Sequence, residues 1–169
     1  MLAADSASFG PLLNKVHNLF LDRKLSLATA ESCTGGLLGA VLTHMPGSSA
    51  YYSGGVIAYA NEAKTRLLGI SAALIDQHGA VSSHVAREMA EKIKAMLTAD
   101  IAIAITGISG PGGGTLQKPV GTVWTAIAHA GGTEIELLQL QGDRSFVRAQ
   151  AAHAVLERLV ALVLAAKSP

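Results

Sequence analysis

Apolar segments of strand type alternate with amphipathic helical segments along this sequence, and that alternation restricts the possible folds more than any other feature. Strand-type patterns of β-branched and small apolar residues fill five segments: 25–30, 51–59, 100–108, 120–128 and 134–140. Helical spacing of apolar residues marks the segments around them: 11–24, 37–45, 61–69, 82–97 and 145–165. We therefore predict an α/β protein with a mixed sheet of about five strands and helices on both faces.

Several residues define the expected ends and faces of these elements. A short Gly-containing turn separates residues 120–128 from residues 134–140, so these two strands should form an antiparallel hairpin. Pro11 is expected near the first turn of the first helix, and Asn61 can cap a short helix. We expect Met96 to lie on the buried face of its helix.

Composition and charge exclude several classes of protein. Half of the 169 residues are hydrophobic and no linker divides them, so we expect a single domain over residues 1–169. Thirteen Lys and Arg residues balance twelve Asp and Glu residues, so no basic field attracts a nucleic acid and we expect no such partner. The longest apolar run, residues 159–166, is shorter than the roughly 20 residues of a spanning helix, so we expect no membrane association. A single cysteine and the lack of a secretory pattern predict a cytoplasmic protein without disulfides.

The glycine-rich segment GISGPGGG, residues 107–114, follows a predicted buried strand. Thr115 stands where the dinucleotide-binding fingerprint needs its third glycine, and no P-loop pattern follows. A loop of this length in a compact domain is usually functional, and glycines let main-chain amides approach an anion. A flexible connection is the alternative. The candidate ligand contacts are Thr106, Gly107, Gly110, Gly112 and Gly113.

A second candidate site is the strand-to-helix turn ESCTGG, residues 31–36. Open α/β sheets bind ligands at the carboxyl ends of their strands, where such a turn lies. Ser32 or Cys33 would be presented there, and the free N–H groups of the following helix start would bind an anion. That helix start consists of Thr34, Gly35 and Gly36. A simple Ser/Thr helix cap with two glycines is the alternative.

Tyr59, Asn61 and Lys64 lie together at a strand-to-helix junction. Burial lowers the pKa of a lysine, so Lys64 is a candidate base, although a lysine on a short helix is usually a solvated charge. Arg144 and Arg148 are four residues apart and can clamp a phosphate or carboxylate, or merely lie on a surface.

The histidines do not form a pattern that is typical of a metal site. No HExxH motif is present, and the nearest pair, His78 and His84, is six residues apart. We therefore predict no metal site.

Six segments in order resemble the CinA C-terminal domain family: TAESCTGG (29–36), GSSAYYSGGVIAYANEAK (47–64), HGAVS (78–82), TGISGPGGG (106–114), KPVGTVW (118–124) and GDR (142–144). The characterised activity of that family is nicotinamide-nucleotide amidase, also called NMN deamidase or PncC. The resemblance implies a three-layer α/β/α fold with a mixed, mostly parallel sheet, and commonly a homodimer.

The resemblance further implies hydrolysis of nicotinamide mononucleotide to nicotinic acid mononucleotide and ammonia. The catalytic group of the family corresponds to Ser32, Tyr59 and Lys64, and no cofactor or metal is implied. Lys64 would activate Ser32 directly or through the Tyr59 hydroxyl, and Tyr59 would pass the proton to ammonia.

Three choices stay open at this point. Cys33 is the rival nucleophile, because a thiol is intrinsically more reactive. The substrate phosphate is bound either by the 107–114 loop with Arg144 or by the helix start at 34–36, which otherwise supplies the oxyanion hole. The alternative functions are a non-catalytic nucleotide-binding protein and a competence- or damage-associated scaffold.

Overall fold

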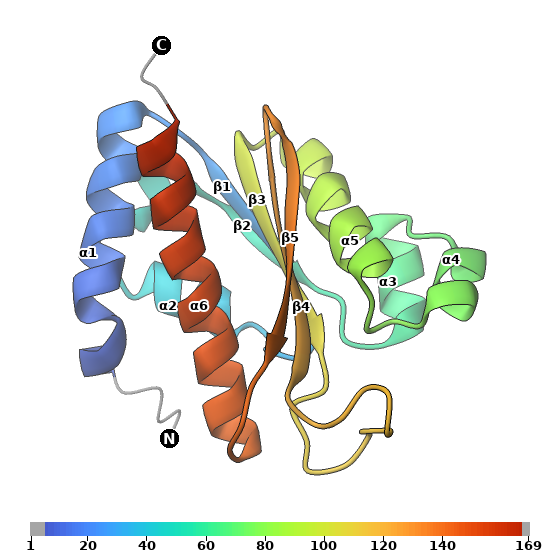
Figure 1. Cartoon of the computed structure of the whole chain (residues 1–169). Helices are drawn as coiled ribbons and strands as arrows, with labels where there is room; N and C mark the ends of the chain where they lie inside the picture. Colours follow the sequence, from blue (N-terminus) through green and yellow to red (C-terminus); the bar gives the residue numbers. More distant parts are fainter. Residues whose placement is uncertain (1–5, 167–169) are drawn as a thin grey trace.

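The computed structural model describes residues 6–166 of the chain (Figure 1). Its elements in chain order are α1 (Ser6–Arg23), β1 (Leu27–Glu31), α2 (Leu37–Thr43), a 3₁₀ turn (Ser48–Ala50), β2 (Tyr52–Ile57), α3 (Asn61–Leu68), α4 (Ala72–His78), α5 (Ser83–Met96), β3 (Ile101–Gly107), β4 (Thr122–His129), β5 (Gly132–Gln139) and α6 (Arg144–Ala165). Within residues 6–166, no helix combines the length and the apolar character that crossing a bilayer requires.

The five strands form one mixed sheet in the order β2-β1-β3-β4-β5, which confirms the predicted α/β class. β1 pairs in parallel with both β2 and β3, whereas β3 with β4 and β4 with β5 are antiparallel. Only β4 therefore runs against the others, so the sheet is mostly parallel in strand direction but evenly divided between the two kinds of pairing. The predicted hairpin is confirmed as β4 and β5.

Helices cover both faces of the sheet, as Figure 1 shows: α1, α2 and α6 lie on one side and α3, α4 and α5 on the other. Strand residues alternate between the two sides, because successive side chains of a strand point to opposite faces. In β3 the isoleucines at 101, 103 and 105 join the core under α1 and α6, while Ala102 and Ala104 face α5. The small alanine side chains leave room for α5 to pack close to the sheet.

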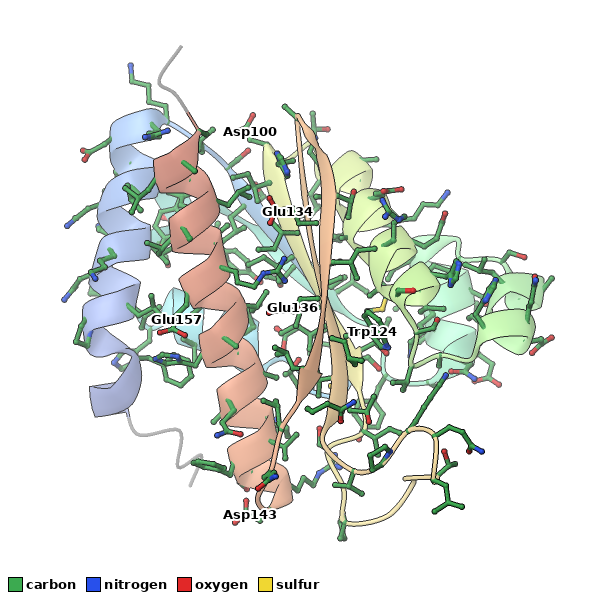
Figure 2. The ribbon with its side chains drawn as sticks, in the orientation of Figure 1. Asp100, Trp124, Glu134, Glu136, Asp143 and Glu157 are labelled. Carbon is green, nitrogen blue, oxygen red and sulfur yellow. The ribbon has the colours of Figure 1, made fainter. Side chains whose placement is uncertain are left out.

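Figure 2 shows how the outer strand β5 meets α6. Glu134 and Glu136 lie on the side of β5 that faces α6, where carboxylate oxygens are 3.5 Å and 3.2 Å from the guanidinium of Arg158. Trp124, on β4, points to the opposite side, toward α5. These contacts anchor the antiparallel half of the sheet between two helices.

Three local predictions need correction. The first helix already begins at Ser6, so Pro11 lies inside it rather than near its start. Ala60 occupies the N-cap position of α3, and Asn61 is the first helical residue without a capping role. Met96 is half exposed, because Leu97, one position further along, takes the inward direction and packs against the core.

Gly55 in β2 has no space for a side chain, and this leads to a prediction about stability. A Cβ atom there would collide with Thr29 Oγ1 and lie 2.8 Å from both Thr29 O and Tyr52 Oη. We expect Gly55→Ala to lower the free energy of unfolding by about 1–3 kcal/mol, measured by urea denaturation. Gly10→Ala is the control, since nothing lies within 4 Å of a Cβ there and alanine favours a helix. A Gly55→Ala protein as stable as the wild type would contradict this packing.

Candidate active site

β2 and β3 lie on either side of β1, and the connections before and after β2 cross opposite faces of the sheet. This topological switch determines where a site can form. β1 connects to β2 through α2 on one face of the sheet, and β2 connects to β3 through α3, α4 and α5 on the other face. Such a switch point leaves a crevice at the carboxyl ends of neighbouring strands. Figure 2 shows Asp143 at this end of the sheet and Asp100 at the opposite end.

A cavity of about 260 Å³ lies at the carboxyl ends of β1 and β3. Its lining combines the end of β1, the start of α3, the segment between α4 and α5, the end of β3 and the start of α6. The loop between β3 and β4, residues 108–121, also contributes, and we call it the glycine loop. The residues are Ser32, Cys33, Tyr59, Asn61, Lys64, Ala80, Val81, Thr106, Gly107, Ile108, Ser109, Gly110, Gly112, Gly113 and Arg144. Ten of the thirteen site residues predicted from the sequence are in this set, and the exceptions are Thr34, Gly35 and Gly36.

Ser32 and Lys64, 32 positions apart in the sequence, meet in this cavity. Lys64 Nζ lies 3.0 Å from Ser32 Oγ, and both residues are buried, with Lys64 only 1% exposed. The Ser32 backbone is fixed, because its N–H donates to Ile105 O at 2.9 Å and so extends the pairing of β1 with β3. Ala58 N–H donates to Glu31 O at 2.8 Å, which holds the chain leading to α3 beside the same strand end.

The Lys64 amine is buried and makes polar contacts only with the protein. Burial lowers the pKa of Lys64 from its ordinary value. The amine also donates to Ala58 O at 3.1 Å and Tyr59 O at 3.2 Å. A neutral amine has two N–H groups and one lone pair, so with both N–H groups on these carbonyls the lone pair is left for the Ser32 hydroxyl. The arrangement is chemically able to remove a proton from Ser32.

Cys33 lines the same cavity, but its thiol is poorly suited to attack. Burial raises the pKa of Cys33 to about 11, so the thiol stays protonated near neutral pH. The thiolate is the reactive form of a cysteine. Of the two candidate nucleophiles, the geometry therefore favours Ser32.

The Tyr59 hydroxyl does not connect Lys64 to Ser32. It lies 2.6 Å from Arg144 Nη2, and Tyr59 is 56% exposed, whereas Lys64 contacts only the Tyr59 carbonyl. Lys64 is thus in direct contact with Ser32, without the Tyr59 hydroxyl between them. Arg144 also donates to Gly110 O at 2.9 Å, so it joins Tyr59 to the glycine loop at the rim of the cavity. A cation in the first turn of a helix is disfavoured by the helix dipole, and these contacts account for its position in α6.

The N–H groups of Gly35 and Gly36 are already occupied, which disfavours the helix start at 34–36 among the alternatives left open. The backbone N–H groups of Gly36, Leu38 and Gly39 donate to the buried Glu31 carboxylate at 3.0, 3.1 and 2.8 Å. Gly35 N–H donates to Ser32 O at 3.0 Å. The start of α2 is already occupied by the side chain of Glu31, which disfavours it as the site of a substrate anion. Glu31 was missed because a carboxylate at the end of a strand resembles a solvated residue.

Arg148 and Arg144 do not form a common clamp. Arg148 donates through Nε and Nη2 to Thr34 O, at 3.1 Å and 2.6 Å, and lies outside the set of cavity residues. Thr34 is fully buried. Arg148 thereby fixes the turn that follows Ser32, while of the two arginines only Arg144 lines the cavity.

The glycine loop carries several backbone N–H groups that are not bound to an acceptor in the described part of the chain. Within residues 6–166, the backbone N–H groups of Ser109, Gly110, Gly112 and Gly113 have no hydrogen-bond acceptor. Successive free amides of this kind form an anion-binding concavity. Thr106 is buried and its hydroxyl donates to Ala80 O at 2.8 Å, which connects the end of β3 to the opposite wall.

His78 and His84 lie close together but do not converge on a common point. Their rings stack at a centroid distance of 3.7 Å and an interplanar angle of 14°. Among the described residues, no group of three or more His, Cys, Asp or Glu side chains is arranged to hold a metal ion.

Comparison with known proteins shows that one family matches nearly the whole chain. The sequence model of the CinA C-terminal domain matches residues 10–163. A CinA-like protein of Gemmatimonas aurantiaca is 55% identical over 137 residues, which cover 81% of this chain and 32% of that protein. A CinA-like protein of Mycolicibacterium vanbaalenii is 57% identical over 124 residues, covering 73% of this chain and 29% of that protein. The chain thus spans about a third of the length of these curated relatives.

Solved structures with the same fold are similar over nearly their full length. The competence damage-inducible protein A of Klebsiella pneumoniae superposes with a TM-score of 0.90 at 38% identity, covering 93% of this chain and 98% of that one. A competence/damage inducible protein of Agrobacterium tumefaciens gives 0.87 at 37% identity, covering 90% and 93%.

Proposed function

Because the chain belongs to the CinA C-terminal domain family, we propose that it is an amidohydrolase that converts nicotinamide mononucleotide to nicotinic acid mononucleotide and ammonia. The observation that carries this proposal is the buried Lys64 amine, 3.0 Å from Ser32 Oγ, in a cavity with free loop amides. A protein that only bound a nucleotide would have no need of a buried amine next to a hydroxyl, and burying an amine costs stability.

The proposed reaction begins with Lys64 taking the proton of Ser32 Oγ, which then attacks the carboxamide carbon. The resulting Lys64 ammonium returns the proton to the amide nitrogen, and ammonia leaves. Ser32 then carries the acyl group as an ester, and a water activated by Lys64 hydrolyses it. No step requires a metal ion.

Tyr59 takes a different part in this scheme from the one the sequence predicted. With its hydroxyl on Arg144, it contacts the substrate at the rim of the cavity instead of carrying a proton. For the developing oxyanion, Cys33 is the candidate donor: it follows the nucleophile, lines the cavity, and its N–H has no acceptor within residues 6–166.

The remainder of the cavity suits a mononucleotide. Its volume of about 260 Å³ lies just below the usual range of ligand pockets, roughly 300–1,000 Å³, which favours one nucleotide over a dinucleotide. We assign the phosphate to the free amides of the glycine loop and to Arg144, and Asn61 to the substrate at the start of α3.

The direct test is incubation of the purified chain with nicotinamide mononucleotide while ammonia is measured. We expect ammonia and nicotinic acid mononucleotide in equal amounts, at a rate that a metal chelator leaves unchanged. Binding of the nucleotide without turnover would contradict the proposal and favour the non-catalytic alternative. Activity that a chelator abolishes would contradict the mechanism.

The pH dependence of the rate follows from the lowered pKa of Lys64. Only the neutral amine accepts the proton of Ser32, so kcat/KM is expected to rise with pH through that pKa and then become constant. Because burial moves the pKa below its ordinary value, the rise comes at lower pH than for an exposed lysine. Initial rates between about pH 6 and pH 10 measure it. A rate that falls with pH across this range would contradict a lysine base.

A further inference from the structure

Two cationic side chains connect the glycine loop, residues 108–121, to the rest of the molecule. Arg144, at the rim of the cavity, donates to Gly110 O. On the far side, Lys118 Nζ donates to Val81 O at 2.7 Å and to His78 O at 3.2 Å. Lys118 itself lies outside the set of cavity residues, so it acts from behind the wall of the cavity.

The segment to which Lys118 binds is the opposite wall of the cavity. It joins α4 to α5, and two of its residues, Ala80 and Val81, line the cavity. Gly79 in the same segment has a φ of +77°, and a Cβ atom there would lie 3.1 Å from Lys118 Nζ. A glycine at this position thus provides both the backbone conformation and the space that the amine occupies.

Lys118 is also coupled to its own loop through a tight turn. Its N–H donates to Thr115 Oγ1 at 3.0 Å, and Thr115 N–H donates back to Lys118 O at 2.9 Å. The turn projects into solvent, with Leu116 at its tip 99% exposed. Within residues 6–166, the exposed tip makes no apolar contacts that could fix this part of the loop. The hydrogen bonds of Lys118 therefore fix it instead.

We propose that Lys118 is a positioning residue that holds the glycine loop against the wall formed by residues 78–82. The loop amides of Gly110, Gly112 and Gly113 then face the cavity in one arrangement before the substrate arrives. Without this anchor, binding must first order the loop, and that loss of chain entropy weakens affinity. The inference rests on the proposed function for its substrate, and it concerns binding, since Lys118 touches neither Ser32 nor Lys64.

The kinetic test compares Lys118→Met with wild type and with Lys92→Met, using nicotinamide mononucleotide as substrate. Methionine keeps an unbranched stem but cannot donate, and Lys92 is an exposed lysine whose partner Glu88 lies 3.8 Å away. We expect Lys118→Met to raise KM about tenfold with kcat within about twofold, and Lys92→Met to change neither. An unchanged KM in Lys118→Met would overturn the assignment, whether or not kcat is lower.

Amide hydrogen exchange on the same proteins does not depend on activity. We expect Lys118→Met to exchange faster in residues 108–121 and 78–82 and at the wild-type rate elsewhere. Unchanged exchange in both segments would overturn the anchoring role. If the wild type releases no ammonia, the proposed function fails, and the exchange data alone decide whether Lys118 holds the loop.

Discussion

Replacing Ser32 by alanine is expected to lower the rate of ammonia release from nicotinamide mononucleotide by at least about 10³-fold, because removing a nucleophile abolishes the covalent route and leaves only substrate binding. Ser32 is buried and its backbone is held by Ile105, so the loss of one oxygen should leave the fold intact. Steady-state rates together with a thermal unfolding curve for each variant separate lost chemistry from lost structure.

Cys33→Ala is the matched comparison, since it removes the neighbouring sulfur from the same cavity. Its thiol is kept protonated by burial, so we expect this variant to lose less than about tenfold in rate. The opposite order, an active Ser32→Ala and an inactive Cys33→Ala, would make Cys33 the nucleophile and contradict the mechanism.

Removing the base is expected to have the second large effect. Lys64→Met should lower kcat by about 10²–10⁴-fold, the usual contribution of a general base. Lys64→Arg should be impaired as well, because a guanidinium stays charged and has no lone pair to accept a proton. Lys92→Met, on the exposed face of α5, is the control for loss of a lysine. An active Lys64→Arg protein would show that the position needs only a positive charge, and the base would have to be another group.

The same substitution makes the cost of the buried amine measurable as stability. The pKa of Lys64 is lowered in the folded state, so between that value and the ordinary value of 10.5 the unfolded chain binds more protons than the folded one. The free energy of unfolding of the wild type should therefore increase relative to Lys64→Met as pH rises through this window. Urea denaturation at several pH values measures the difference. A difference that is constant with pH would mean that folding does not perturb the amine.

Local sequence patterns predicted the elements of the fold well, because the side chains that define them act through short-range rules. The alternation of isoleucine and alanine in residues 101–105 places large side chains on one face of β3 and small ones on the other. The short turn between residues 128 and 134 predicted a hairpin, and β4 and β5 do pair antiparallel. The prediction that Met96 is buried was wrong, because a helical period of 3.6 residues allows either of two neighbouring positions to face inward. In the structure Leu97 packs against the core.

The site was less predictable, because its contacts join segments that lie far apart in the sequence. The pairing of Ser32 with Lys64 came from the resemblance, since the spacing of the two residues carries no information about their contact. The direction of the Tyr59 hydroxyl depends on Arg144, 85 positions away. The helix start at 34–36 looked available because nothing in the local sequence indicates that Glu31 turns back to occupy it.

In the proposed mechanism the activation of Ser32 depends on the protonation state of one amine, so the titration of Lys64 is the most direct measurement. In protein labelled with ¹³C at the lysine ε-carbons, the Lys64 resonance is assigned as the one missing from Lys64→Met, and its chemical shift is followed with pH. With Lys64 as the base, we expect a transition clearly below the ordinary lysine pKa of 10.5, in step with the rise of kcat/KM. A Lys64 resonance that titrates at or above 10.5 would contradict a lysine base, because the amine would then stay charged near neutral pH.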